Sequence, residues 1–401
     1  MHTSPLAQPG TGDGGGMNVY VRQLASALAR SGVECDVYTR ASSPAQVAVA
    51  AVEPGLRVHH VAAGPLGPVP KEELVELVAE FTDGVSARLS GDYAPDAIHA
   101  NYWLSGLAGH ALKHELNVPL VSTFHTLARV KAEGDEDPVG RAQAEAEVMA
   151  CSDAVLASCS VEAAQIAGLY DVGRDRIEIV PPGVDHAFFS PGHRPQARRA
   201  LGLPAGPMLL FVGRIQALKG VDVAVGALAA LAAGSGPARD DAFLVVVGGP
   251  SGPDGMAEVA RVRRMVTELG LVGRVRFVDP QPHELLSTYY RAADLCLVPS
   301  RSESFGLVAL EAAACGTPVV AAAVGGLRTL VQHGTTGFLV ENRDADAFAR
   351  FAGDVLADPG LAEGMSLAAA EDARRYTWSL AAGRLRQLCS RITARSLVAC
   401  R

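Results

Sequence analysis

The sequence predicts an α/β protein built from two doubly wound domains. Short apolar runs, such as 118–123 and 243–247, alternate with helical stretches along both halves of the chain. This alternation is typical of parallel strands that are covered by helices on both faces. The rhythm breaks at a segment rich in proline and glycine, 181–195, where we expect the hinge. At 401 residues the chain is too long for one ordinary core and fits two domains.

The first predicted domain covers residues 1–186. A helix is expected over 18–30, because apolar residues recur there at helical spacing and Gly32 follows as a stop. Strand-like runs follow at 33–38, around Ile98, at 118–123 and at 154–157. A doubly wound domain usually begins with a strand. This sequence instead begins with residues typical of a loop, Met1–Pro5. We therefore expect either that the first strand is absent or that the recorded start codon lies inside the true gene.

The second predicted domain covers residues 187–375. Its strands are expected at five apolar runs: 208–212, 243–247, 275–278, 295–298 and 318–322. Helices are expected over 221–233 and 305–314, and a closing helical segment, 376–401, is expected to pack onto the first domain. In such domains ligands bind at the carboxyl ends of the strands, so functional groups are expected in the loops that follow them.

Composition narrows the classes of function. A hydrophobic content of 49% with 19% charged residues is that of a folded globular protein, and the net charge of −8 argues against nucleic acid or an anionic membrane as a partner. No apolar run reaches the roughly 18 residues of a membrane span, and no signal-peptide pattern opens the chain. We therefore expect a cytoplasmic protein. Its seven cysteines are scattered without CxxC pairs, which favours reduced thiols and no metal centre.

The first candidate motif is the glycine-rich segment 10–16. It contains the pattern G-x-G-x-x-G, with Glu34 or Asp36 about twenty residues further on, which is compatible with an NAD-dependent dehydrogenase. The strand that precedes such a pattern is missing from the sequence. We favour a simpler interpretation, in which Gly15 and Gly16 let the amides at the start of a helix approach an anion. A flexible loop without a ligand is the remaining alternative.

The second motif, 211–220, follows a predicted strand and carries two cations, Arg214 and Lys219. A glycine, Gly213, ends the strand, so both cations lie in the loop that caps it. Two permanent positive charges in such a loop can neutralise a diphosphate leaving group. An ordinary solvated loop is the alternative.

The third motif, 299–311, contains two glutamates, Glu303 and Glu311, and also follows a predicted strand. A helix is expected to begin near Ser304, and the amides of its first turn would point at an anion. Eight helical residues span roughly 12 Å, so one carboxylate can bind a sugar ring while the other binds a ribose. Glu311 is flanked by apolar residues and needs a polar partner there. The alternative is a helix-capping glutamate together with a surface glutamate.

These motifs together resemble glycosyltransferase family 4. The resemblance rests on the segments ESFGLVALE (303–311), VGRIQALKG (212–220) and the GGM loop (15–17), and it covers nearly the whole chain. Within that family the sequence is most similar to the actinobacterial enzymes that open mycothiol synthesis, the D-inositol-3-phosphate (1L-inositol 1-phosphate) N-acetylglucosaminyltransferases. The resemblance implies the GT-B fold, in which two doubly wound, Rossmann-like domains face a cleft, and sugar transfer with retention of the anomeric configuration.

The resemblance also implies roles for donor-side residues. Arg214 and Lys219 would bind the donor diphosphate, and Glu311 would bind the ribose. Glu303 would bind the transferred sugar, and His125 would lie beside that sugar. The catalytic groups would be Arg214, Lys219, His125 and Glu303. The donor site as a whole would comprise Gly15, Gly16, Gly213, Arg214, Lys219, Arg291, Glu303, Ser304, Phe305, Gly306, Leu307 and Glu311.

On the acceptor side, the resemblance implies that Asn18 binds the cyclitol. The phosphate of the cyclitol would be bound by Lys71, Tyr102, Thr126 and Arg141. Two cations and two hydroxyl groups from separate loops form a suitable phosphate cradle by their chemistry alone. The sequence departs from the family at Arg301, where a tyrosine is common. A natural-product glycosyltransferase with another acceptor is therefore a rival interpretation.

The expected reaction is attack by an acceptor hydroxyl on the anomeric carbon while UDP leaves, with UDP-N-acetylglucosamine or UDP-glucose as donor. No DxD-type acidic pair is suited to holding a metal diphosphate, so no metal and no further cofactor are expected. The expected partners are a small-molecule donor and acceptor, with a homodimer as an open alternative. Two other rivals remain: a nucleotide-sugar 2-epimerase, which shares the GT-B architecture without an acceptor cradle, and a non-catalytic sugar-nucleotide binding protein.

Overall fold

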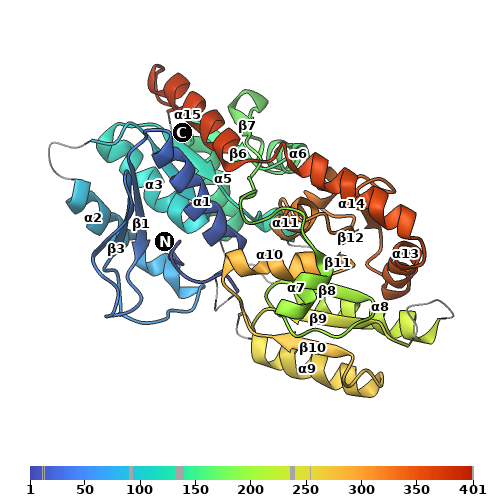
Figure 1. Cartoon of the computed structure of the whole chain (residues 1–401). Coiled ribbons are helices and arrows are strands. Elements are labelled where there is room, and N and C mark those ends of the chain that lie inside the picture. The colour runs from blue at the N-terminus through green and yellow to red at the C-terminus, as the bar shows by residue number, and fades with distance from the viewer. Residues whose placement is uncertain are drawn as a thin grey trace. The chain divides into compact units, whose positions relative to one another are not determined.

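The computed structural model describes residues 1–10, 12, 14–89, 94–131, 140–234, 240–252 and 254–399 (Figure 1). Contacts divide the chain into two compact units. The first unit contains residues 1–7, 17–183 and the segment from Trp378 onward, and the second contains residues 8–16 and 184–377. The glycine-rich segment thus belongs to the second unit by its contacts, although most of the first unit follows it in sequence. The predicted α/β class is confirmed in both units.

The first unit contains two separate sheets. One has the order β1–β3–β2 and consists of β1 (Cys35–Arg40), β3 (Leu56–Val61) and β2 (Val49–Glu53). The other is parallel and consists, in order, of β4 (Ile98–Asn101), β5 (Leu120–Thr123), β6 (Ala154–Ala157) and β7 (Ile177–Ile179). Strands are present where the sequence predicts β1, β4, β5 and β6. The prediction omits β2, β3 and β7. Positions 47–52 are all apolar, so composition did not hide β2, whereas β7 is only three residues long.

Helices pack on these two sheets. The predicted helix over 18–30 is confirmed as α1 (Gly16–Arg30). The other helical elements of the unit are η1 (Glu73–Leu77), α2 (Val78–Leu89), α3 (Trp103–Leu116), α4 (Ala128–Lys131), α5 (Arg141–Cys151), α6 (Ser160–Tyr170), η2 (Arg174–Arg176) and α15 (Trp378–Thr393). The main core cluster contains Leu104 and Leu112 of α3 and Val148 of α5. This core fixes the ends of α3 and α5, where several predicted site residues lie.

The second unit contains a six-stranded parallel sheet in the order β10–β9–β8–β11–β12–β13. Its strands are β8 (Met208–Val212), β9 (Phe243–Val247), β10 (Val275–Val278), β11 (Leu295–Val298), β12 (Val319–Ala322) and β13 (Gly337–Val340). The five predicted strands are present, and the edge strand β13 is added. Along the chain, β8, β9 and β10 follow one another toward one edge of the sheet, and β11, β12 and β13 then follow one another toward the other edge. The strand order thus reverses between β8 and β11. Ligands of doubly wound folds bind at this reversal, beyond the carboxyl ends of the strands.

The helices of the second unit alternate with these strands along the chain and pack against the sheet (Figure 1). They are α7 (Arg194–Ala200), η3 (Ala217–Lys219), α8 (Val221–Ala233), α9 (Gly255–Glu268), α10 (His283–Ala292), α11 (Leu307–Ala314), α12 (Leu327–Leu330), α13 (Ala345–Ala357) and α14 (Pro359–Ala373). The core joins Leu209 and Leu297 of the sheet to Leu228 of α8 and Phe348 of α13, all at most 1% exposed. In the part of the chain that the structure describes, no helix is both long and apolar enough to cross a membrane.

The cysteines differ in part from the expectation. Cys151 is disulfide-bonded, so the prediction of reduced thiols throughout is wrong at this position. The other described cysteines carry thiols, namely Cys35, Cys159, Cys296, Cys315 and Cys389. Spacing along the sequence could not reveal the bond, because disulfide pairing depends on distances in the folded chain.

Candidate active site

The charged motif residues of the second unit meet at the loops after β8 and β11. Lys219 is the last residue of η3, and its Nζ forms an ion pair with Oε1 of Glu303. The same carboxylate oxygen accepts a hydrogen bond from the Ser300 hydroxyl at 3.0 Å. The Lys219 and Glu303 side chains are 23% and 18% exposed, so a ligand can reach the pair.

Close backbone packing joins these two loops. Gly220 has a φ of 72°, and a Cβ added there would overlap the Pro299 carbonyl and lie 2.7 Å from Nη2 of Arg343. Nε of Arg343 donates to the same Pro299 carbonyl at 2.8 Å. The Arg301 N–H donates to the Leu218 carbonyl at 2.8 Å. Only glycine combines this φ with so little room, so Gly220 is what allows the Lys219 loop to lie against the Glu303 loop.

A second close approach fixes the segment that carries Glu303. The Gly326 N–H donates to the Glu303 carbonyl at 2.9 Å. A Cβ at Gly326 would overlap the Phe305 Cα and the Ser304 carbonyl and lie 2.6 Å from the Phe305 carbonyl. Helix α11 starts after Gly306, whose φ is 105°. The helix therefore begins two residues later than the sequence predicts, because the left-handed Gly306 acts as its N-cap.

The glycine-rich segment lies against the other donor-side cation. A Cβ added at Gly15 would lie 3.4 Å from Nε of Arg214, and one added at Gly16 would lie 3.5 Å from Cδ1 of Leu307. Nη1 of Arg214 also donates to the Ser251 hydroxyl at 3.2 Å. Gly15, Gly16 and Arg214 therefore form a single neighbourhood with the first turn of α11. The amides of a first helical turn have no partner inside the helix and can bind an anion.

Glu311 of α11 is 5% exposed, and both of its carboxylate oxygens have partners from α10. Nε2 of His283 lies 2.7 Å from Oε1, and the Tyr290 hydroxyl donates to Oε2 at 2.9 Å. Burial disfavours the charged form of His283. The carboxylates of Glu311, Glu284 and Asp185 outweigh burial and raise the pKa of His283. The polar partner that Glu311 requires is thus supplied by two residues of α10, neither of which the sequence motifs singled out.

Two further residues of the predicted donor site, Gly213 and Arg291, donate hydrogen bonds to backbone carbonyls. The Gly213 N–H donates to the Val247 carbonyl at 3.0 Å, which continues the contact between β8 and β9 into the loop. Nε of Arg291 donates to the Ser190 carbonyl at 2.7 Å, and its Nη2 donates to the Phe188 carbonyl. The structure therefore gives Arg291 a role in holding the chain around 188–190, and its contact with the donor stays a prediction.

In the first unit, His125 is held in a neutral form. Its φ is 62°, and its Nε2 lies 2.8 Å from the Asn101 amide oxygen. The rings of Tyr20 and His125 pack in a T-shaped contact with centroids 4.8 Å apart. Burial, together with nearby His99, lowers the pKa of His125 to about 3. The imidazole is therefore uncharged near neutral pH, with one ring nitrogen that donates a hydrogen bond and one that accepts.

The residues of the predicted phosphate cradle lie together in the first unit. Lys71 Nζ lies 5.0 Å and Arg141 Cζ 5.2 Å from the centroid of the Tyr102 ring. Nη2 of Arg141 donates to the carbonyl and to the hydroxyl of Thr126, both at 2.9 Å. Two cations thus flank one aromatic ring, and one of them is fixed to Thr126.

A buried carboxylate that the sequence did not reveal supports this cluster. Glu145 is fully buried, and its Oε1 accepts from Nε of Arg141 at 2.8 Å. Its Oε2 accepts from the Tyr170 hydroxyl and, at 2.9 Å, from the Ala128 N–H. The spacing of Arg141 and Glu145, four residues apart on one helix, is the signal that could have found the pair. Asn18, by contrast, donates to the Thr3 hydroxyl at 2.9 Å, on the N-terminal segment.

One group of side chains in the described ranges has the composition of a metal site. The ligand atoms of His110, His114 and Cys151 lie within 4.8 Å of one another. The sulfur of Cys151 is already disulfide-bonded, and a disulfide sulfur is not the thiolate that binds metal. In the described state the cluster therefore offers two imidazoles only.

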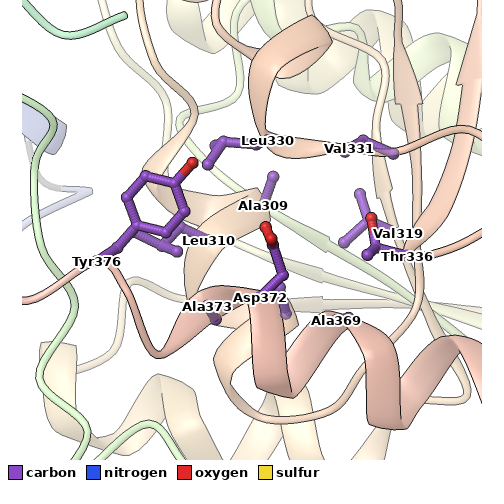
Figure 2. A pocket seen from close by; sticks show the side chains of 11 residues that line it. Ala309, Leu310, Val319, Leu330, Val331, Thr336, Ala369, Asp372, Ala373 and Tyr376 are labelled. Atoms are coloured by element: carbon purple, nitrogen blue, oxygen red, sulfur yellow. The ribbon is translucent and has the colours of Figure 1, made fainter.

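A small pocket lies beside the buried face of α11 (Figure 2). Its wall combines Ala309, Leu310 and Ala313 of α11 with residues of α14. Figure 2 shows the Tyr376 ring and the Asp372 carboxylate beside the apolar side chains of the wall. None of its lining residues belongs to the predicted donor or acceptor sets. The pocket adjoins the predicted donor site through its lining residue Tyr376, whose ring packs against Phe305 with centroids 5.6 Å apart.

Comparison with known proteins identifies the family. A family model described as "Glycosyl transferases group 1" matches residues 193–372, and one described as "Glycosyl transferase 4-like domain" matches residues 15–183. A D-inositol 3-phosphate glycosyltransferase from Acidothermus cellulolyticus is 47% identical over 390 residues, which cover 94% of this chain and 86% of the relative. The chain belongs to the group 1 glycosyltransferases. A relative of the same name from Actinosynnema mirum is 48% identical over 387 residues, with coverages of 94% and 92%.

Solved structures place this glycosyltransferase in the GT-B fold class. The sucrose-phosphate synthase from Thermosynechococcus elongatus is 35% identical and superimposes with a TM-score of 0.90, covering 98% of both chains. WaaG, a glycosyltransferase involved in lipopolysaccharide biosynthesis, is 21% identical with a TM-score of 0.72, covering 95% of this chain and 97% of its own. The second likeness shows a shared fold alone. The predicted fold class is confirmed.

The packing at Gly326 leads to a first prediction for this glycosyltransferase. Gly326→Ala should push the backbone of Ser304 and Phe305 away and displace Glu303, because the new Cβ has no room. We expect a loss of stability of roughly 1–3 kcal/mol and a fall in turnover larger than the stability loss explains. Thermal denaturation and initial rates at a temperature where the variant is folded would measure the two effects.

Gly364→Ala is the matched control, because a Cβ at this exposed position of α14 meets nothing within 4 Å. The control should be neutral or slightly stabilising, since alanine favours helix more than glycine does. Wild-type turnover in folded Gly326→Ala would contradict the view that this contact positions Glu303.

Proposed function

We propose that this glycosyltransferase moves a glucose- or N-acetylglucosamine-type sugar from UDP to a hydroxyl of an inositol phosphate, with net retention. The observation that carries the proposal is the Lys219–Glu303 ion pair, which lies between the loops after β8 and β11. An anion-binding cation and a sugar-binding carboxylate, paired and accessible, are the two groups that a nucleotide-sugar donor requires. The names of the relatives from A. cellulolyticus and A. mirum support the inositol phosphate acceptor.

Charge stabilisation of the leaving group accounts for the donor half of the reaction. As the bond from the anomeric carbon to the β-phosphate oxygen breaks, negative charge grows on the diphosphate and positive charge on the sugar ring. Arg214, Lys219 and the first-turn amides of α11 would stabilise the diphosphate. The phosphate would replace Glu303 as the partner of Lys219, which releases Glu303 to hydrogen-bond the sugar hydroxyls.

The acceptor proton requires a base, and His125 is poorly suited to becoming charged. Its lowered pKa, about 3, means that a proton on this buried imidazole is strongly disfavoured. We propose that the neutral ring hydrogen-bonds the transferred sugar and that the leaving phosphate accepts the acceptor proton. Chemistry without a metal stays a prediction.

The acceptor phosphate is proposed to bind in the first unit, among Lys71, Tyr102, Thr126 and Arg141. The support is the approach of both cations to the Tyr102 ring and the hydrogen bonds between Arg141 and Thr126. The proposed binding of the cyclitol by Asn18, a cytoplasmic location and a homodimer stay predictions.

The direct test is a product screen with purified protein. UDP-N-acetylglucosamine, UDP-glucose and the corresponding GDP-sugars would each be incubated with inositol phosphate, inositol or a sugar phosphate, and products would be identified by mass. NMR of the new anomeric centre reports retention. Absence of product from every UDP-sugar would overturn the proposal, and an epimerised sugar formed from donor alone would assign a 2-epimerase instead.

Removal of the Lys219 charge gives the second prediction. Lys219→Ala should lower turnover at saturating donor by on the order of 10²-fold, because the developing charge on the diphosphate loses its nearest cation. Initial-rate kinetics with both substrates would measure the effect. Arg374→Ala, at a side chain that is 74% exposed, is the control for removing a positive charge elsewhere. A rate within a few fold of wild type would place Lys219 outside the reaction centre.

The third prediction concerns the acceptor phosphate. Arg141→Lys should raise the KM for inositol phosphate and leave the KM for the donor and for unphosphorylated inositol unchanged, because lysine keeps the charge and loses the planar fork. The milder lysine is chosen because complete removal would leave Glu145 buried and unpaired, at a cost of roughly 3–5 kcal/mol. An unchanged KM for inositol phosphate in the folded variant would remove Arg141 from the cradle.

A further inference from the structure

We infer that helix α10 fixes the orientation of Glu311, and that Tyr290 and His283 are positioning residues for recognition of the donor ribose. This inference rests on the proposed function, in which Glu311 binds the ribose hydroxyls. It assigns a function to two side chains that touch Glu311 and that no sequence motif contains. In this role Tyr290 and His283 act through Glu311 and do not themselves contact the reacting atoms.

The geometry of the contact gives each carboxylate oxygen its own donor. His283 Nε2 lies 2.7 Å from Oε1 of Glu311, and the Tyr290 hydroxyl donates to Oε2 at 2.9 Å. His283 and Tyr290 are seven residues apart, close to two helical turns, so they project from the same face of α10. Two donors on different oxygens restrict rotation of the carboxylate. Each oxygen keeps a second lone pair that can accept a ribose hydroxyl.

The environment of Glu311 explains why such partners are required. The side chain is 5% exposed, and its neighbours Leu310 and Ala312 are at most 1% exposed. A carboxylate in that setting is costly unless it is hydrogen-bonded. Tyr290 is fully buried, and burial raises its pKa well above the usual value for a tyrosine. The hydroxyl therefore stays protonated and remains a donor over the whole working range of pH.

A second layer holds the two donors in place. The fully buried Phe189 ring packs against His283, with centroids 5.0 Å apart, and against Tyr290 at 6.1 Å. Arg291 binds the chain on both sides of Phe189, at the carbonyls of Phe188 and Ser190. Arg291 thus supports Phe189 and, through it, α10, and its direct contact with the donor stays a prediction.

The charges around His283 make this arrangement dependent on pH. The groups that face it are Glu311 on α11, Glu284 on α10 itself and Asp185 in the segment before α7, together with the neutral Tyr290 and Phe189. Burial opposes the protonated form, but the three carboxylates outweigh it, so the pKa of His283 is raised. His283 therefore carries its charge below that raised pKa. As the pH rises through the pKa of His283, the imidazole loses its charge and its hydrogen bond to Glu311 becomes weaker.

Binding of UDP tests the inference without turnover. Wild type should bind UDP at least about tenfold more tightly than 2′,3′-dideoxy-UDP, since a hydrogen bond to a charged group contributes about 1.5–3 kcal/mol. Tyr290→Phe and His283→Asn should reduce this ratio to below about threefold, because a mobile Glu311 binds the ribose less well. Calorimetry with the two nucleotides gives both dissociation constants. In both variants the KM for the UDP-sugar should rise by a larger factor than kcat falls, because the lost interaction is one of donor binding.

Tyr289→Phe is the matched control, because Tyr289 is the adjacent tyrosine on α10 and is also buried, at 7% exposed. It should keep the wild-type ratio between the two nucleotides. If Tyr290→Phe also keeps that ratio while folded, α10 does not position Glu311 and the inference is overturned. If wild type binds no UDP, or binds both nucleotides equally, the proposed function of the donor site fails instead.

The pH profile of the nucleotide ratio tests His283 separately. In wild type the preference for UDP over the dideoxy nucleotide should decrease as the pH rises through the pKa of His283. In His283→Asn it should be low and independent of pH. An unchanged wild-type profile in His283→Asn would remove His283 from the positioning role and leave Tyr290 alone in it. Should His283→Asn fail to fold, the isosteric Tyr290→Phe still decides the role of α10.

Discussion

The ion pair between Lys219 and Glu303 joins the loops that follow β8 and β11, on the two sides of the point where strand order reverses. The donor site as described depends on this contact. Neither loop could approach the other with a side chain at Gly220, and the Glu303 segment could not lie on its neighbour with one at Gly326. Backbone packing therefore sets where the charges lie, and the ion pair then fixes their orientation. A charged site needs this rigidity, because preorganised charges stabilise a transition state without further reorganisation.

Each of the three proposed ligand-binding regions is built around a paired charge. Glu303 pairs with Lys219, Glu311 with His283 and Tyr290, and Arg141 with Glu145. The physical reason is common to all three, since an unpaired charge that is partly or fully buried costs more than a single hydrogen bond returns. At Lys219 alone, the intramolecular partner Glu303 occupies the place that the proposed ligand would take. The partners also explain why these side chains are ordered before a donor or acceptor binds.

The sequence predicted the parts of the site that are local to one strand and its loop. Arg214, Lys219 and Glu303 follow apolar runs, so the parallel-sheet pattern puts them at the carboxyl ends of the strands, and the helix that follows carries Glu311. The partners of these residues were beyond its reach. His283 precedes Glu311 by 28 residues, and Tyr170 follows Glu145 by 25. Only the packing of separate helices brings such pairs together. The hairpin β2–β3 was missed although positions 47–52 form a continuous apolar run.

The ion pairs of the proposed donor and acceptor subsites differ in burial, and therefore in whether a ligand can replace one partner of the pair. The side chains of Lys219 and Glu303 are 23% and 18% exposed, whereas those of Arg141 and Glu145 are 2% and 0% exposed. Opening a sealed pair leaves a buried charge at a cost of roughly 3–5 kcal/mol, while solvent and ligand can replace either partner of an open pair. The donor pair can therefore exchange partners when a diphosphate arrives. The acceptor pair keeps its geometry, so an acceptor anion must fit Arg141 where Glu145 and Thr126 hold it.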